Sequence, residues 1–204
     1  EYIKPGEIEK RSFALIAQEL GDRQLDPEQE PVIKRVIHTT ADFDYADTLH
    51  FTAHAVERMQ RAIREGACIV TDTQMAKAGI NKKELTRYGG EVLCFIGDED
   101  VAKEAAERGI TRAAVSMEKA AGLSGELIFA VGNAPTALMR LYELMEAGAI
   151  RPAGIIGVPV GFVNVVEAKE QILQADCPMI VARGRKGGSN VAAAICNALL
   201  YQCI

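Results

Sequence analysis

The fold is decided by the stretch LIFAVGNAPT, residues 127–136, in which five apolar residues run without interruption into a short polar turn. A short run that is apolar on both faces is typical of a strand buried inside a parallel sheet. Pro135 then opens a segment with helical periodicity, and proline is common in the first turn of a helix. The stretch therefore predicts a strand over residues 127–131 and a helix from Pro135 to Ala147.

The same strand-and-helix unit recurs on both sides of this stretch. Four more apolar runs bounded by Gly, Pro, Asp or Arg predict strands at Ala67–Thr71, Val92–Ile96, Gly154–Val158 and Met179–Ala182. Helical patterns are expected at Asp98–Arg108, Asn164–Gln174 and Gly188–Tyr201. This alternation predicts an α/β protein: a three-layer, doubly wound parallel sheet of about five strands in flavodoxin-like order, with helices on both faces.

The first third of the chain has helical periodicity without the short apolar runs that alternate with helices in the rest. This pattern predicts three helices, at Pro5–Leu20, Glu28–Thr39 and Ala46–Arg64. We expect a helical N-terminal part, residues 1–65, packed on an α/β core of residues 66–204. The chain contains no linker, low-complexity tract or internal repeat, so we expect residues 1–204 to form a single domain.

Composition excludes several classes of protein. The 204 residues are 49% hydrophobic and 25% charged with a net charge of -5, which excludes disorder, collagen and coiled coil. No apolar stretch approaches the roughly 20 residues of a membrane span, and no signal-peptide core is present, so we expect a cytoplasmic protein without a membrane partner. A pI near 5.3 argues against a nucleic-acid partner. Five cysteines without CxxC spacing are expected to be reduced core residues.

Ligands of open α/β sheets bind beyond the carboxyl ends of the strands, where helix N-termini offer free N–H groups. Three loops fall there: GNAPT at 132–136, GVPVGFVN at 157–164 and RGRKGGSN at 183–190. The last loop places three cations and three glycines at the start of a helix, which indicates an anion site. The alternative is a solvated basic turn in which glycines only cap the helix. Neither P-loop nor dinucleotide-binding spacing is matched, so a nucleotide is not specifically indicated.

All three histidines lie in the helical N-terminal part. His50 and His54 are four residues apart, and Glu57 follows one turn later, so one helix would place them together where a metal could bind. The alternative is that these side chains serve helix packing or face solvent. Arg35 and His38 share a helix face, which would put a cation beside an acid/base group. The alternative there is a terminal histidine favoured by the helix dipole.

Ser12 places a polar group on an apolar stripe between Ile8 and Ile16. A serine in this position can serve a ligand, or it can bond back to its own helix.

Five blocks of the sequence, in order and spanning essentially the whole chain, together resemble a known family. They are RVIH at 35–38, TDTQM at 71–75 followed by AGI at 78–80, GNAPTAL at 132–138, GVPVGFV at 157–163 and RGRKGGS at 183–189. These blocks resemble the signature segments of the precorrin-8 methylmutases of cobalamin biosynthesis. Asn164 departs from the small residue expected there, which affects local helix packing rather than chemistry.

The resemblance implies an isomerase that moves a methyl group from C-11 to C-12 of the corrin macrocycle, converting precorrin-8 to hydrogenobyrinate or cobalt-precorrin-8 to cobyrinate. It implies a flavodoxin-like fold and a homodimer with the site near the subunit interface. The family's catalytic histidine maps onto His38, and its substrate-binding serine and arginine map onto Ser12 and Arg35. No protein cofactor or metal is expected, because any cobalt is carried by the corrinoid substrate.

Further substrate-binding candidates follow from loop position. They are Asn133, Thr136, Arg183, Lys186, Gly187, Gly188 and Ser189, with Val158, Pro159, Val160 and Phe162 as apolar walls. Two other classes of function remain open from the residues alone. A non-catalytic tetrapyrrole or anion carrier would use the same basic loop but would not need a histidine beside Arg35. A nucleotide-dependent oxidoreductase is disfavoured by the missing fingerprint.

Overall fold

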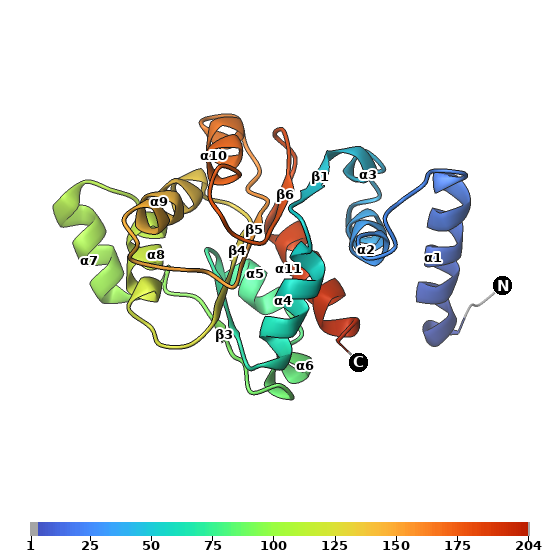
Figure 1. Ribbon diagram of the computed structural model, residues 1–204, viewed down its shortest axis with the longest axis horizontal. Coiled ribbons are helices and arrows are strands. Elements are labelled where there is room, and N and C mark those ends of the chain that lie inside the picture. The colour runs from blue at the N-terminus through green and yellow to red at the C-terminus, as the bar shows by residue number, and fades with distance from the viewer. Residues whose placement is uncertain (1–3, 204) are drawn as a thin grey trace.

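The strands form one six-stranded sheet in the order β1-β6-β5-β4-β2-β3 (Figure 1). The structure is a computed structural model that describes residues 4–203. Five strands are parallel, and the first of them, β2, lies between β3 and β4, which is the predicted flavodoxin-like order. The parallel strands are β2 (Cys68–Thr71), β3 (Val92–Leu93), β4 (Leu127–Val131), β5 (Gly154–Gly157) and β6 (Met179–Ala182).

The sixth strand corrects a sequence prediction. The helix expected over Ala46–Arg64 is wrong: the structure has α3 (Tyr45–Thr48), then β1 (Leu49–Phe51), then α4 (Ala55–Arg64). β1 runs antiparallel to β6, with Leu49 opposite Ala182. The exposed edge of β6 needs backbone partners, and β1 supplies them; helical periodicity cannot outweigh that demand. Residues 1–65 are therefore not wholly helical.

Helices cover both faces of the sheet, as Figure 1 shows with α7 to α10 on one side and α2, α4, α5 and α11 on the other. The helix bounds are α1 (Pro5–Leu20), α2 (Glu30–Thr40), α5 (Gln74–Gly79), α6 (Lys82–Thr86), α7 (Glu99–Arg108), α8 (Arg112–Ala121), α9 (Pro135–Glu146), α10 (Val165–Ile172) and α11 (Ser189–Tyr201). The sequence did not predict α5, α6 and α8.

Alternation along the strands explains the two covered faces. In β4, Ile128 and Ala130 join the core under α2, α4 and α11, whereas Phe129 and Val131 join the core under α8, α9 and α10. All five residues of β4 are buried, which is why the strand reads as a continuous apolar run.

α11 is the central helix of its layer. It packs against α2, α4 and α5 and against the sheet, so its residues are buried almost all round. α1 lies beyond α2 at the outer edge of the molecule (Figure 1) and packs mainly on α2. None of the helices within residues 4–203 is long and apolar enough to cross a membrane.

The five cysteines are free thiols, as expected, and three of them are buried. Burial raises the pKa of Cys177 and of Cys196 to about 12, so both are protonated, inert core groups at neutral pH.

Candidate active site

The turns after β2, β4, β5 and β6 meet at the carboxyl edge of the sheet, where the sequence placed the ligand. The glycine at the end of β4 makes this possible. A Cβ on Gly132 would lie 2.7 Å from the Ser189 Cα and 2.9 Å from the Gly188 carbonyl oxygen. The Ser189 hydroxyl in turn lies 2.7 Å from that of Thr73 after β2. Three turns are therefore locked together, and Ser189 is buried in the process.

Asp72 organises this edge, although the sequence marks it only as one residue of the TDTQM block at 71–75. Its buried carboxylate accepts backbone N–H bonds from Gly132 (2.8 Å), Asn133 (2.9 Å) and Ala134 (2.7 Å). Burial raises the pKa of this carboxyl, and the three N–H donors act in the opposite direction. The turn into α9 is consequently already satisfied by a protein carboxylate, so the Asn133 backbone N–H does not face a ligand.

The basic loop after β6, residues 183–189, has cations that are all engaged by other side chains. The Lys186 ammonium lies 2.6 Å from both Asp42 and Asp44, and the Arg183 guanidinium lies 3.4 Å from Glu170. Hydrogen bonding to the two aspartates raises the pKa of Lys186, and the same contact lowers the pKa of Asp42. A ligand carboxylate that binds Lys186 or Arg183 would therefore have to replace the acidic side chains that these cations already contact.

The glycines of this loop permit a very close approach to the turn after β5. A Cβ on Gly187 would lie 2.1 Å from the Val158 carbonyl oxygen, and the Gly188 N–H donates to that same oxygen at 2.9 Å. Gly188 also has a φ of 139°, a region that favours glycine. A side chain at Gly187 would require the backbone of the turn after β5 to move, and one at Gly188 would strain the backbone of the loop itself.

Lys169 on α10 supports the loop from inside the protein. Its side chain is fully buried, and its Nζ donates to the carbonyl oxygens of Gly184 (2.8 Å) and Lys186 (2.9 Å). Burial lowers the pKa of Lys169 to about 8, so the amine is still charged at neutral pH. Sequence reasoning missed this residue, although a lysine among Val165, Ala168 and Ile172 on one buried helix face was a visible signal.

The end of α2 presents the predicted acid/base group. The exposed His38 ring stacks on Phe13 of α1, with centroids 5.1 Å apart and planes 8° from parallel. The Arg35 guanidinium lies 4.7 Å from the same Phe13 ring and 5.2 Å from the ring of Tyr201. Asp42 and Asp44, which follow α2, bring this helix end to the basic loop through Lys186.

Arg35 and Ser12 each already have a polar partner on α1, which are Glu9 and the Ile8 carbonyl. Arg35 forms an ion pair with Glu9, so its charge is partly neutralised. The Ser12 hydroxyl donates to the Ile8 carbonyl at 2.9 Å, the local bond that was the alternative interpretation from sequence. Its oxygen retains lone pairs, so Ser12 can still accept a hydrogen bond from a ligand.

Three predicted contributors are not available to a ligand at this edge. The Thr136 hydroxyl lies 2.8 Å from that of Thr111, and both line a cavity between α8 and α9, on the sheet face opposite α2. Val158 and Pro159 are buried and cannot form a wall. Val160 and Phe162 remain, with exposed fractions of 47% and 83%, and the Arg185 guanidinium lies 5.5 Å from the Phe162 ring.

Asn164, the departure noted in the sequence, takes a left-handed conformation before α10.

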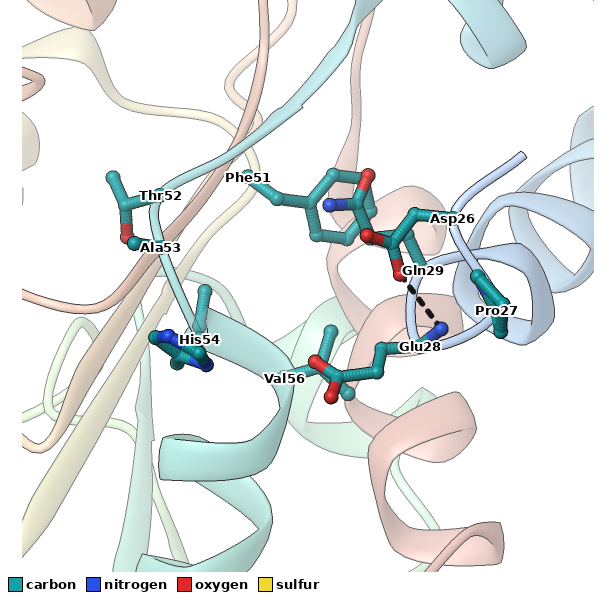
Figure 2. Close-up of a pocket in the computed structure, with 10 residues that line it drawn as sticks. Asp26, Pro27, Glu28, Gln29, Phe51, Thr52, Ala53, His54 and Val56 are labelled. Atoms are coloured by element: carbon teal, nitrogen blue, oxygen red, sulfur yellow. Dashed lines mark hydrogen bonds between the residues drawn. The ribbon is translucent and has the colours of Figure 1, made fainter. Parts of the chain in front are cut away.

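A cavity of about 490 Å³ lies away from the catalytic and substrate-binding residues that the sequence predicts. Figure 2 shows His54 on one wall and Asp26 and Glu28 on the other, where the Glu28 N–H donates to Asp26 at 2.8 Å. His50 lies in β1 and His54 precedes α4, so the two histidines do not share the helix face on which the metal hypothesis depended. Among residues 4–203, no three His, Cys, Asp or Glu side chains are grouped to hold a metal.

Comparison with known proteins shows which family this chain resembles in sequence and in structure. The family described as precorrin-8X methylmutase matches residues 7–202. The chain is 47% identical to a cobalt-precorrin-8 methylmutase of Salmonella typhimurium, over 98% of this chain and 97% of the relative. It is 40% identical to a precorrin-8X methylmutase of Pseudomonas aeruginosa, over 98% and 97%. The crystal structure of a precorrin-8x methyl mutase from Thermus thermophilus superposes with a TM-score of 0.88 at 40% identity, covering 96% of each chain. The chain therefore belongs to the precorrin-8X methylmutase family, and it is a methylmutase, an isomerase of cobalamin biosynthesis.

Proposed function

We propose that this chain moves the methyl group of precorrin-8 or cobalt-precorrin-8 from C-11 to C-12, with His38 as general acid and base. The observation that carries the proposal is the placement of His38: an exposed imidazole, held flat against Phe13, beside the Arg35 cation. The members of the family named above support the choice of substrate. Any cobalt belongs to the substrate.

The reaction is an isomerisation, so its atoms balance without a co-reactant. The imidazolium of His38 donates a proton to the pyrrolic nitrogen of ring C, which draws the conjugated electrons toward the product arrangement. The bond from the methyl carbon to C-11 breaks as the bond to C-12 forms. The proton then returns to His38. General acid catalysis of this kind contributes about 10²- to 10⁴-fold, and fixed orientation of the macrocycle supplies the rest.

The stacked geometry suits this role. Stacking on Phe13 favours one plane for the imidazole, since the two rings lie parallel with their centroids 5.1 Å apart.

Substrate binding requires partners for acetate and propionate arms. The loop of residues 183–189 offers Arg183 and Lys186, and the α1–α2 face offers Arg35 and Ser12. Each of the three cations already has an acidic partner, so a substrate carboxylate binds by displacing an acid of similar charge. This exchange keeps the affinity for any single arm moderate and makes binding depend on several arms together.

We also propose a homodimer in which α1 lies at the subunit contact. α1 exposes two large apolar side chains, Ile8 at 51% and Leu15 at 56%, and it packs mainly on α2 within its own chain. Covering such residues with a second copy would remove apolar surface from water and hold Phe13 against His38.

The experiment is incubation of the purified protein with enzymatically prepared precorrin-8 and cobalt-precorrin-8. We expect the absorbance spectrum to change to that of hydrogenobyrinate or cobyrinate, and carbon-13 NMR to place the labelled methyl group on C-12. A non-catalytic carrier would bind the corrinoid and leave both the spectrum and the methyl position unchanged.

A further inference from the structure

The Arg35 guanidinium is held by aromatic side chains from two other helices. Its Cζ lies 4.7 Å from the ring centroid of Phe13 on α1 and 5.2 Å from that of Tyr201, the last residue of α11. An aromatic ring attracts a cation through its electron-rich face. Among residues 4–203, the guanidinium donates a hydrogen bond only through Nη1, to Glu9. Its other donors, on Nε and Nη2, therefore remain for a ligand.

The Tyr201 ring is fixed at its hydroxyl as well as at its own helix. The hydroxyl oxygen accepts a hydrogen bond from Asn81 Nδ2 at 3.2 Å. Asn81 caps α6, and its Oδ1 accepts from the Glu84 N–H at 3.2 Å. Because the amide oxygen is taken up by that cap, the NH₂ end of Asn81 is the end that faces Tyr201.

Further contacts attach the segment that carries Asn81 to α11. The Asn81 N–H donates to Asn197 Oδ1 at 2.8 Å, and Asn197 Nδ2 donates to the Gly79 carbonyl at 3.0 Å. A Cβ on Gly79 would lie 2.8 Å from the Ala193 Cβ, so this segment packs closely on α11. The position of Tyr201 is consequently set by contacts that do not involve Arg35.

A cavity of about 310 Å³ adjoins the guanidinium. Phe13, Arg35 and Tyr201 line it together with Pro31 and Ala198. The Arg35 side chain is 21% exposed, so a ligand can reach it. A long arginine side chain loses rotamer freedom when it binds a ligand, and holding it in place beforehand lowers that cost.

We infer that Tyr201 is a positioning residue for the proposed reaction: together with Phe13, it holds the Arg35 guanidinium where it binds a carboxylate arm of the corrinoid. The inference rests on the proposed function, since it takes the corrinoid as the ligand of Arg35. Tyr201 acts through Arg35, so its loss weakens substrate binding and leaves the chemical step unchanged.

The test compares Tyr201→Leu and Tyr201→Phe with wild type and with Tyr142→Leu. Tyr142 is a half-buried tyrosine of α9, in the core on the other face of the sheet. For Tyr201→Leu, we expect the Kd for hydrogenobyrinate, from absorbance titration, and the KM for precorrin-8 to rise about three- to tenfold, the range for loss of one cation–π contact. kcat should stay within about twofold. Tyr201→Phe keeps the ring and should recover most of the loss, and Tyr142→Leu should match wild type.

A double-mutant cycle shows whether Tyr201 acts through Arg35. In an Arg35→Met background, Tyr201→Leu should change the Kd by less than about 1.5-fold, because no cation is left to position. A residue that only stabilises α11 would instead lower the Tm of Tyr201→Leu and leave its Kd and KM at the wild-type values. That result, or an equal rise of the Kd in both backgrounds, would overturn the inference while wild type still binds and converts the corrinoid. If wild type neither binds nor converts it, the proposed function fails and the inference falls with it.

Discussion

Asp72→Asn offers a direct measure of how strongly one buried carboxylate holds the carboxyl edge of the sheet together. In the native protein, the two oxygens of Asp72 accept three N–H bonds between 2.7 and 2.9 Å long. Asparagine presents only one acceptor oxygen to these donors, and its amide N–H₂ faces an N–H group with which it cannot bond. At least one backbone N–H of the turn into α9 is then buried without a partner.

The expected magnitude follows from these contacts. Hydrogen bonds to a charged group contribute roughly 1.5–3 kcal/mol each, neutral ones roughly 0.5–1.5 kcal/mol, and an orphaned buried donor costs about 1–3 kcal/mol. Removing the buried charge offsets part of this loss. We expect the free energy of unfolding to fall by about 2–4 kcal/mol, which for a domain of this size lowers the Tm by about 4–16 °C.

The assay is thermal unfolding followed by circular dichroism at neutral pH, with Asp22→Asn as the matched control. Asp22 is exposed, so the same chemical change there should leave the Tm within about 1 °C. A Tm for Asp72→Asn that equals that of the control would refute the argument that Asp72 organises the edge. A large loss in Asp22→Asn would show that the charge change alone accounts for the effect.

Three further changes probe the site. Phe13→Leu removes the ring that stacks on His38, and we expect kcat to fall about two- to tenfold with the protein still folded, as steady-state kinetics would show. Lys186→Met removes the hydrogen bond that lowers the pKa of Asp42; its stability deficit relative to wild type should be present above pH 4 and disappear as the pH falls through the lowered pKa, measured as Tm against pH. Gly187→Ala places a Cβ against backbone and should lower stability by about 1–3 kcal/mol in denaturant unfolding. Gly97→Ala, whose Cβ would meet only the Gln74 side chain at 3.9 Å, is the control and should lose less.

The architecture was predictable because its strands are buried on both faces. Each of the five parallel strands appears in the sequence as a short apolar run, and the turn signals on either side set their bounds to within a few residues. β1 was not predictable in the same way. Leu49–Phe51 is only three residues long, and what makes it a strand is the open edge of β6, more than 100 residues later in the chain.

Part of the candidate site was also visible from sequence. His38 and Arg35 could be placed on one helix face by spacing, and the Gly187 turn by its glycines. The Phe13 ring that both side chains contact could not be placed by spacing, because it reaches them from another helix. Lys169 falls between these cases: its place on an apolar helix face was a local signal, but its carbonyl partners depend on how α10 meets the loop after β6.

The central claim is that His38 transfers the proton that drives methyl migration, and single-turnover absorbance measurements on His38→Ala test it most directly. The account predicts that His38→Ala binds hydrogenobyrinate with a Kd within about threefold of wild type, while the rate of the spectral change falls at least about 100-fold, the lower range for loss of a general acid. Conversion of precorrin-8 at the wild-type rate by folded His38→Ala would contradict the account.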